Sequence, residues 1–94
     1  MARTAKKRLV VTFSTTGDAI AAEQSLAGLK RTCRGCGRLI PVPREISAGC
    51  GMAWKDELEL KDEIVRQLEK DSITPEVITT IEFLEKSKNI FLQP

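Results

Sequence analysis

Histidine is absent from this chain of 94 residues, and aromatic residues are scarce. The absence of histidine removes the usual general base near neutral pH, Cys/His nucleophile pairs and imidazole ligands for a metal ion. The aromatic residues are Phe13, Trp54, Phe83 and Phe91. Sheets that bind RNA display aromatic side chains for base stacking, so we expect no nucleic acid as a partner.

Long hydrophobic runs are also missing. The apolar run Leu9–Phe13 follows a basic start and is too short for the core of a signal peptide or for a membrane span. The three cysteines, an odd number, fit a reducing compartment better than a secreted disulfide framework. We therefore expect a cytoplasmic protein without a membrane partner. With 41% hydrophobic residues, 1–94 should form a single domain with one modest core.

The charges are divided unevenly along the chain. Residues 1–44 hold nine Lys/Arg against two Asp/Glu, giving +7, whereas residues 45–94 hold six against eleven, giving −5. One stretch without acidic residues contains Lys30, Arg31, Arg34, Arg38 and Arg44. This stretch would attract an anion or an acidic partner. Alternatively it is a solvated rim that faces an acidic second helix, and we favour this second interpretation.

Hydrophobic periodicity predicts four strands and two helices in the order β-α-β-β-α-β. Thr15 and Asp18 stand at capping-box spacing before the first helix, and Asp56 is in position to cap the second. The expected strands are 9–13, 38–43, 51–55 and 76–83. The last strand should place one set of side chains on one side, namely Val77, Thr79, Ile81 and Phe83.

This order is that of an α+β, ferredoxin-like domain, in which both helices cover one face of a four-stranded antiparallel sheet. Right-handed crossovers place the strands in the order 4-1-3-2. Pro41 and Pro43 cannot donate to a ladder, so their strand should lie at an edge, as this order requires. We expect a core of about 7–83 and a C-terminal tail at 84–94, with the tail as a short helix or an arm for a partner.

The stretch Leu39–Trp54 carries most of the functional information. Two short apolar runs flank a loop with an arginine, a glutamate, a serine and a cysteine between two glycines. A segment built only for packing does not need these groups. Residues 40–51, Ile-Pro-Val-Pro-Arg-Glu-Ile-Ser-Ala-Gly-Cys-Gly, resemble the signature of a small bacterial family described as selenium/sulfur carrier-like proteins. The resemblance extends over roughly residues 6–83; it implies the same fold and marks Cys50 as the candidate residue.

In the expected topology, Cys50 enters the third strand beside the N-terminus of the first helix. Unpaired N–H groups and about half a positive charge at that end favour a thiolate or a bound anion. Arg44 adds a full positive charge, and both effects lower the pKa of a thiol. We therefore predict a catalytic pair, Cys50 and Arg44. The predicted binding residues are Glu45, Ser47, Gly49 and Gly51 in the loop and Ser14, Thr15, Thr16 and Gly17 at the helix.

A plainer interpretation of the same loop is structural. A lone cysteine at the start of a strand is usually a small buried hydrophobe. Arg44 and Glu45 would then pair at the surface, and Ser47 would cap a local turn.

Cys33 and Cys36 form a Cys-x-x-Cys motif, which serves elsewhere as a redox pair, half of a zinc site or a soft-metal clasp. Here the motif follows the first helix, where the helix dipole is negative and works against thiolate formation. We expect both thiols at the end of the sheet opposite Cys50, too far away for one metal ion to join all three within a subunit. A bystander role is favoured, and we predict no metal or other cofactor.

Two functions from different classes fit these residues. In the first, Cys50 accepts a sulfur or selenium atom from a donor protein and passes it to an acceptor enzyme, so the chain is a carrier and not a stand-alone enzyme. In the second, the 44–51 loop and the helix N-terminus bind a small anion or the acidic tail of a partner, without use of the sulfur. Replacement of Cys50 by serine separates the two. The sequence leaves a homo-oligomer open.

Overall fold

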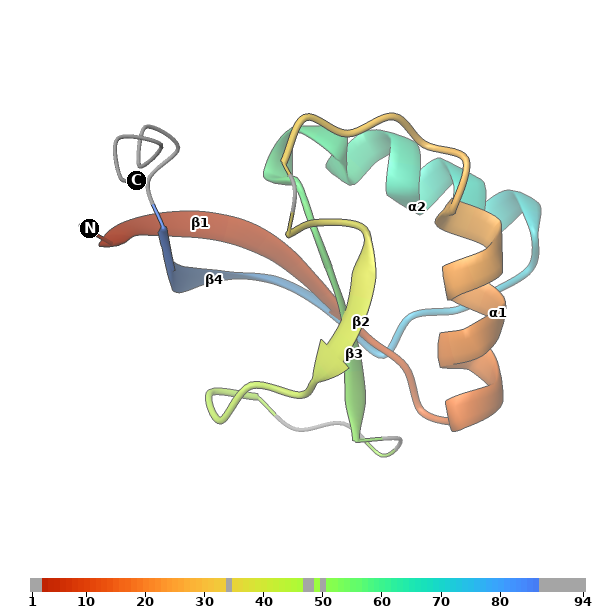
Figure 1. Ribbon diagram of the computed structural model, residues 1–94. Helices are drawn as coiled ribbons and strands as arrows, with labels where there is room; N and C mark the ends of the chain where they lie inside the picture. The colour runs from red at the N-terminus through yellow and green to blue at the C-terminus, as the bar shows by residue number, and fades with distance from the viewer. Residues whose placement is uncertain (1–2, 34, 47–48, 50, 87–94) are drawn as a thin grey trace.

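The protein is an α+β domain in which a four-stranded antiparallel sheet is combined with two α-helices (Figure 1). The computed structural model describes residues 3–33, 35–46, 49 and 51–86. In chain order the elements are β1 (Arg3–Thr12), α1 (Thr16–Leu26), β2 (Arg38–Pro41), β3 (Met52–Asp56), the 3-10 turn η1 (Leu58–Leu60), α2 (Lys61–Lys70) and β4 (Val77–Lys86). No helix in these ranges is long and apolar enough to cross a membrane.

The strands of the sheet lie in the order β2-β3-β1-β4, and each neighbouring pair is antiparallel. This is the expected order 4-1-3-2 read from the opposite edge. The expected position of β2 at an edge and of β1 beside β3 at the centre is therefore confirmed. Pro41 is the last residue of β2 and pairs with Met52 at the start of β3, where its missing N–H costs no inner ladder bond.

One face of the sheet and both helices enclose the main hydrophobic core. Alternate residues of β1 point to this face, so Leu9 and Val11 are buried there together with Trp54 of β3. Helix α1 contributes Ala19, Ala22 and Leu26, and helix α2 contributes Ile64 and Leu68. Figure 1 shows the two helices on the same side of the sheet, as expected.

Among the described residues no helix covers the opposite face of the sheet, yet this face carries a second, smaller apolar cluster. Val10, Ala53 and Ile81 are buried there. Three residues pack against this cluster, namely Ile40, Ile46 and Phe83. Of the predicted stripe on the last strand, Ile81 and Phe83 thus lie in this cluster, whereas Val77 is exposed.

The first and last strands, β1 and β4, are longer than predicted. β1 begins at Arg3, six residues before the expected start, because its polar first half pairs along its whole length with β4. β4 accordingly continues to Lys86, so Leu84–Lys86 are strand and not the start of a tail. Residues 87–94, the rest of the predicted tail, lie outside the described residues.

Asp56 does not cap the second helix. It is the last residue of β3 and is fully buried, and α2 begins only at Lys61, after η1. The N-cap position of α2 is Leu60, which makes no side-chain cap hydrogen bond. The carboxylate of Asp56 instead accepts hydrogen bonds from an arginine in the segment between α1 and β2.

Candidate functional site

The loop between β2 and β3 leaves the sheet in a tight turn. The backbone N–H of Val42 donates to the carbonyl of Gly51 (3.2 Å), which extends the β2–β3 ladder by one bond. The N–H of Ile46 then donates to the carbonyl of Pro43 (3.1 Å), so Arg44 and Glu45 occupy the corner of a turn and are exposed. Ile46 packs on the smaller apolar cluster and thereby fixes this corner to the sheet.

Gly49, near the β3 end of this loop, lies close to the segment that follows β1. A Cβ atom built on Gly49 would lie 2.9 Å from the carbonyl oxygen of Ser14, closer than real Cβ contacts allow. Only glycine therefore fits at this close approach. Ser14 directly precedes the N-cap of α1, so the loop reaches the helix N-terminus, as the topology predicts for this segment. Cys50 and Ser47, two of the predicted site residues, lie outside the described residues.

The N-terminus of α1 is built as the capping pattern predicts. Thr15 is the N-cap in an extended conformation, and its hydroxyl accepts a hydrogen bond from the N–H of Asp18 (3.1 Å). The predicted binding residues Ser14, Thr15, Thr16 and Gly17 are all exposed at this end of the helix. The remaining N–H groups of the first turn favour an anion, although the carboxylate of Asp18 offsets part of that effect.

Arg44 and Glu45 do not neutralise one another in the structure. No ion pair joins them among the described residues, where the salt bridges involve Arg8, Lys55 and Glu85 or Arg31 and Asp56. The predicted surface pair is therefore not formed, and the charge of Arg44 is available to an anion at this loop.

The Cys33–Cys36 motif lies at the other end of β3. The N–H of Gly37, which follows the motif, donates to the carbonyl of Lys55 near the end of that strand (2.7 Å). Gly51, in contrast, precedes the first residue of β3. Cys36 is buried and Cys33 is half-buried, and neither forms a disulfide. The described part of the chain has no group of three or more His, Cys, Asp or Glu residues that could hold a metal ion.

An ion pair beside this motif was not predicted from the sequence. Arg31 donates to both carboxylate oxygens of Asp56 (2.8 Å each) and to the carbonyls of Leu26 and Leu29, which also closes the C-terminal end of α1. The Asp56 carboxylate raises the pKa of Arg31. From the sequence, Arg31 was expected in a solvated rim. No local sequence pattern connects it with an acidic residue that is 25 positions away in the chain.

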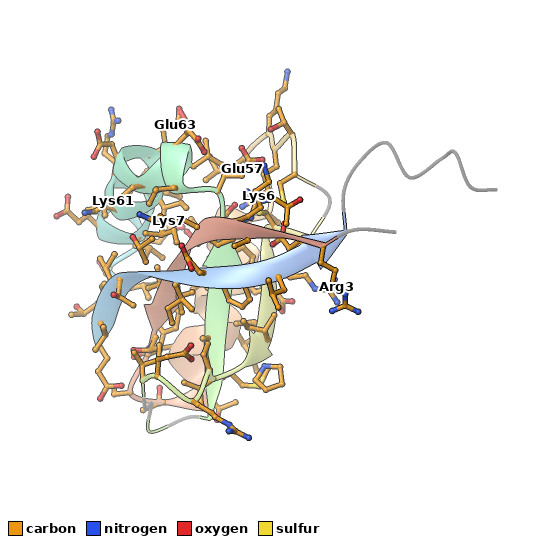
Figure 2. All side chains as sticks on the ribbon, turned by 90° about the vertical axis from the view of Figure 1, so that its left-hand side faces the viewer. Arg3, Lys6, Lys7, Glu57, Lys61 and Glu63 are labelled. Atoms are coloured by element: carbon orange, nitrogen blue, oxygen red, sulfur yellow. The ribbon has the colours of Figure 1, made fainter. Side chains whose placement is uncertain are left out.

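One face of the molecule carries side chains of both charges. In Figure 2, Lys6 and Lys7 on β1 share a face of the molecule with Lys61 and Glu63 of α2. Basic and acidic side chains are thus mixed on this face, and the interpretation of the stretch 30–44 as a solvated rim stays a prediction.

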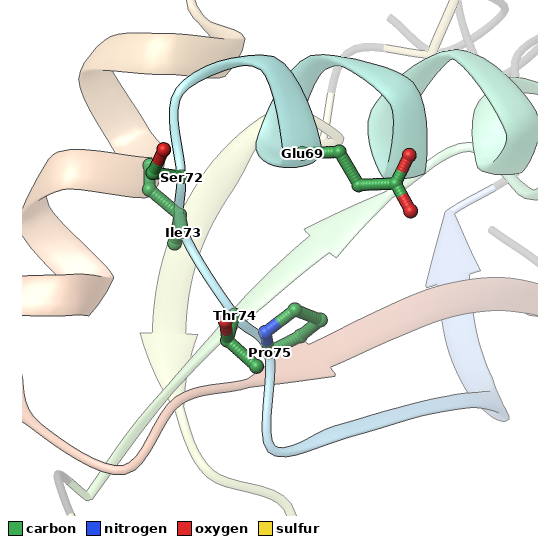
Figure 3. A pocket seen from close by; sticks show the side chains of 5 residues that line it. All are labelled: Glu69, Ser72, Ile73, Thr74 and Pro75. Atoms are coloured by element: carbon green, nitrogen blue, oxygen red, sulfur yellow. The ribbon is translucent and has the colours of Figure 1, made fainter.

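A hollow on the surface is lined by none of the predicted site residues that the structure describes. It is formed where α2 passes into β4 and is lined by Glu69, Ser72, Ile73, Thr74 and Pro75 (Figure 3). Its walls carry one carboxylate and no thiol, so it adds nothing to the chemistry of the cysteine loop.

The structure is a small α+β domain in which Gly49 of the β2–β3 loop lies against Ser14, the residue before the N-cap of α1. The chain belongs to the family described as "Putative Se/S carrier protein-like", whose model matches residues 8–79. The match covers β2, β3, both helices and all three cysteines, together with the second half of β1 and the first three residues of β4. No curated protein and no solved structure matches the chain.

Proposed function

We propose that this protein carries a sulfur or selenium atom on Cys50 and delivers it to an acceptor enzyme. The family match supports a carrier in general. The observation that carries the assignment to Cys50 is the contact of the preceding residue, Gly49, with Ser14, which sets this segment of the loop beside the N-terminus of α1. The protein has three cysteines, an odd number, which fits a reducing compartment better than a secreted disulfide framework. This supports a cytoplasmic location.

The loading step is a nucleophilic displacement. The Cys50 thiolate attacks the outer sulfur of a persulfide on a donor protein, the donor's S–S bond breaks, and the donor cysteine leaves as a thiolate. Cys50 then holds a terminal sulfur as a persulfide. In the delivery step a nucleophile of the acceptor takes this terminal sulfur and Cys50 leaves as a thiolate, so no external oxidant or reductant is consumed. A selenium atom would follow the same route.

The proposed roles of the other residues follow from charge and shape. The guanidinium of Arg44 and the N–H groups of the segment Ser14–Gly17 stabilise the anionic sulfur. Gly49 permits the close approach, and Gly51, with φ +76°, turns the chain into β3. Glu45 and Ser47 are proposed contacts for the donor or acceptor. We further propose that the domain is ferredoxin-like, because its element order and strand order are those of that fold.

A second function is favoured by one specific observation. Arg44 is exposed without an ion pair to Glu45 and stands on the loop that reaches a helix N-terminus. The same groups would bind a small anion or an acidic segment of a partner without covalent chemistry.

Intact-mass analysis after incubation with a persulfide donor, or with a donor that carries selenium in the same position (R–S–Se⁻), separates the two functions. The carrier gains the mass of one sulfur or selenium atom, and Cys50→Ser loses this gain, whereas Cys36→Ser keeps it. An equal gain in wild type and Cys50→Ser would exclude Cys50 as the carrier residue. Retention of partner binding by Cys50→Ser, with no loading of wild type, would establish the binding module instead.

A further inference from the structure

Cys33 and Cys36 are the first and last residues of a turn whose ends lie at a separation that suits a disulfide. The N–H of Cys36 donates to the carbonyl of Cys33 (3.4 Å), which is the hydrogen bond of a four-residue turn. Such a turn holds its end Cα atoms within about 7 Å, and a disulfide needs about 4.4–6.8 Å. A bond between their sulfur atoms therefore requires little movement of the backbone.

Both ends of this turn are anchored to the end of β3. The carboxylate of Glu57 accepts hydrogen bonds from the N–H groups of Thr32 and Cys33, the second at 2.7 Å. After the turn, Gly37 donates to the carbonyl of Lys55 (2.7 Å). Gly37 has φ +75°, and a Cβ atom on it would meet the guanidinium of Arg31, so glycine is required there. Because the turn is preorganised, closing a bond across it costs little conformational entropy.

The two thiols differ in their surroundings. Cys33 is half-buried, whereas Cys36 is 8% exposed, and burial together with the Cys33 thiol raises the pKa of Cys36 to about 12. The positive charge of Arg8 acts in the opposite direction and favours a thiolate at Cys36. The ammonium of Lys55 adds a second cation beside the turn, since its nitrogen would lie 3.7 Å from a Cβ atom on Gly35. The pair thus combines a half-buried cysteine with a buried one.

We propose that Cys33 and Cys36 form a redox-active dithiol that exchanges with small disulfides, separately from any chemistry at Cys50. Cys33 attacks one sulfur of a small disulfide, whose S–S bond breaks and releases one thiolate. Cys36 gives up its proton to solvent and attacks the Cys33 sulfur, which releases the second thiolate. The protein is oxidised by two electrons, and the small disulfide is reduced to two thiols.

Glutathione disulfide serves as the probe, in a Cys50→Ser background that removes the thiol of the proposed carrier function. The folded protein should lose the mass of two hydrogen atoms and regain it with excess reduced glutathione. Trypsin cleaves after Arg34, between the two cysteines, so digestion of the oxidised chain under denaturing conditions should yield two peptides joined by a disulfide.

Single variants in the same background test the order of attack. Cys36→Ser should hold a stable glutathione adduct on Cys33, because the resolving thiol is missing. Cys33→Ser should acquire an adduct at least about tenfold more slowly, because Cys36 is buried and protonated. Free thiols at both positions after exposure of the folded protein to excess glutathione disulfide would overturn the proposal. Equally fast adduct formation on Cys36 and Cys33 in the two variants would also overturn it.

Discussion

Arg44 is the residue whose charge should matter most for the proposed carrier thiol. It is exposed at the corner of the loop, so its effect on Cys50 is that of a partly screened surface charge. We expect Arg44→Ala to raise the pKa of Cys50 and to slow its alkylation at pH 7 about twofold. The measurement is the rate of alkylation against pH, followed by peptide mapping.

Lys30 provides the matched control for Arg44. It is also an exposed cation, but it follows the C-terminal end of α1, away from the loop. Lys30→Ala should leave the alkylation of Cys50 unchanged. An equal effect of both substitutions would show that the response reflects overall charge, and slower alkylation of Cys50 than of Cys33 in the wild type would contradict the carrier assignment.

Asp56 is fully buried, and each of its carboxylate oxygens accepts hydrogen bonds. Oδ1 accepts from Arg31 and from the backbone of Glu57, and Oδ2 accepts from Arg31 and from the indole N–H of Trp54. In Asp56→Asn, an amide N–H donor replaces one carboxylate oxygen and faces these donors. The negative charge that pairs with Arg31 is also lost. We expect a loss of about 3–5 kcal/mol in the free energy of unfolding, measured with urea. Glu59→Gln, at an exposed position nearby, should change it by less than about 0.5 kcal/mol.

At the scale of elements, the contact between Gly49 and Ser14 joins the β2–β3 loop to the start of α1. Gly49→Ala forces the new methyl group against a backbone oxygen that cannot swing away. We expect a loss of about 1–3 kcal/mol in the free energy of unfolding and slower alkylation of Cys50. In Gly28→Ala the added carbon meets nothing within 4 Å, so this control should behave as wild type. Similar results for the two variants would contradict the close approach.

A charge cluster on the open face of the sheet ties β4 to β1 and β3. Glu85 binds Arg8 (2.7 Å) and Lys55 (3.0 Å), and the ammonium of Lys55 lies 4.3 Å from the ring centre of Phe83. The hydrogen bond from Arg8, followed by the contact with Lys55, lowers the pKa of Glu85 to about 2. Its usual value in an unfolded chain is about 4.3. The Glu85 carboxylate therefore binds a proton more weakly in the folded state than in the unfolded state.

This difference predicts a pH-dependent role for Glu85 in stability. A depressed folded pKa stabilises the protein above the unfolded pKa, and this contribution is lost as the pH falls toward about 2. At pH 7 we expect Glu85→Gln to lower the free energy of unfolding by about 1 kcal/mol, allowing for partial exposure. The difference from wild type should vanish near pH 2. Glu82→Gln, exposed on the same strand, should show no such trend; a constant deficit for Glu85→Gln at all pH values would contradict the ion pair.

At the scale of the whole molecule, the two cysteine segments occupy opposite ends of β3. Five residue steps separate Gly51 from Asp56, which corresponds to roughly 15–20 Å along a strand. The double variant Cys33→Ser/Cys36→Ser should therefore load sulfur at Cys50 to the same extent as wild type. The measurement is intact mass after incubation with the persulfide donor. Loss of loading in the double variant would mean that the motif takes part in the transfer within or between subunits.

Much of the architecture follows from the sequence because its signals are local. The alternation of Leu9, Val10 and Val11 between two apolar clusters, the capping spacing of Thr15 and Asp18, and the proline at the edge strand each depend on neighbours in the chain. The loop of Cys50 is likewise predicted to be a site from its residue types alone, and this stays a prediction.

Other features were decided only by tertiary structure. The exposed, polar segment Arg3–Arg8 has no strand signal of its own and is a strand because β4 pairs with it. Likewise, Asp56 has the appearance of a helix cap but ends in the core, where Arg31 and Trp54 satisfy it. The physical reason is the range of the interactions. Hydrophobic period, capping and proline act between near neighbours, whereas strand pairing and buried ion pairs join residues that only the folded chain brings together.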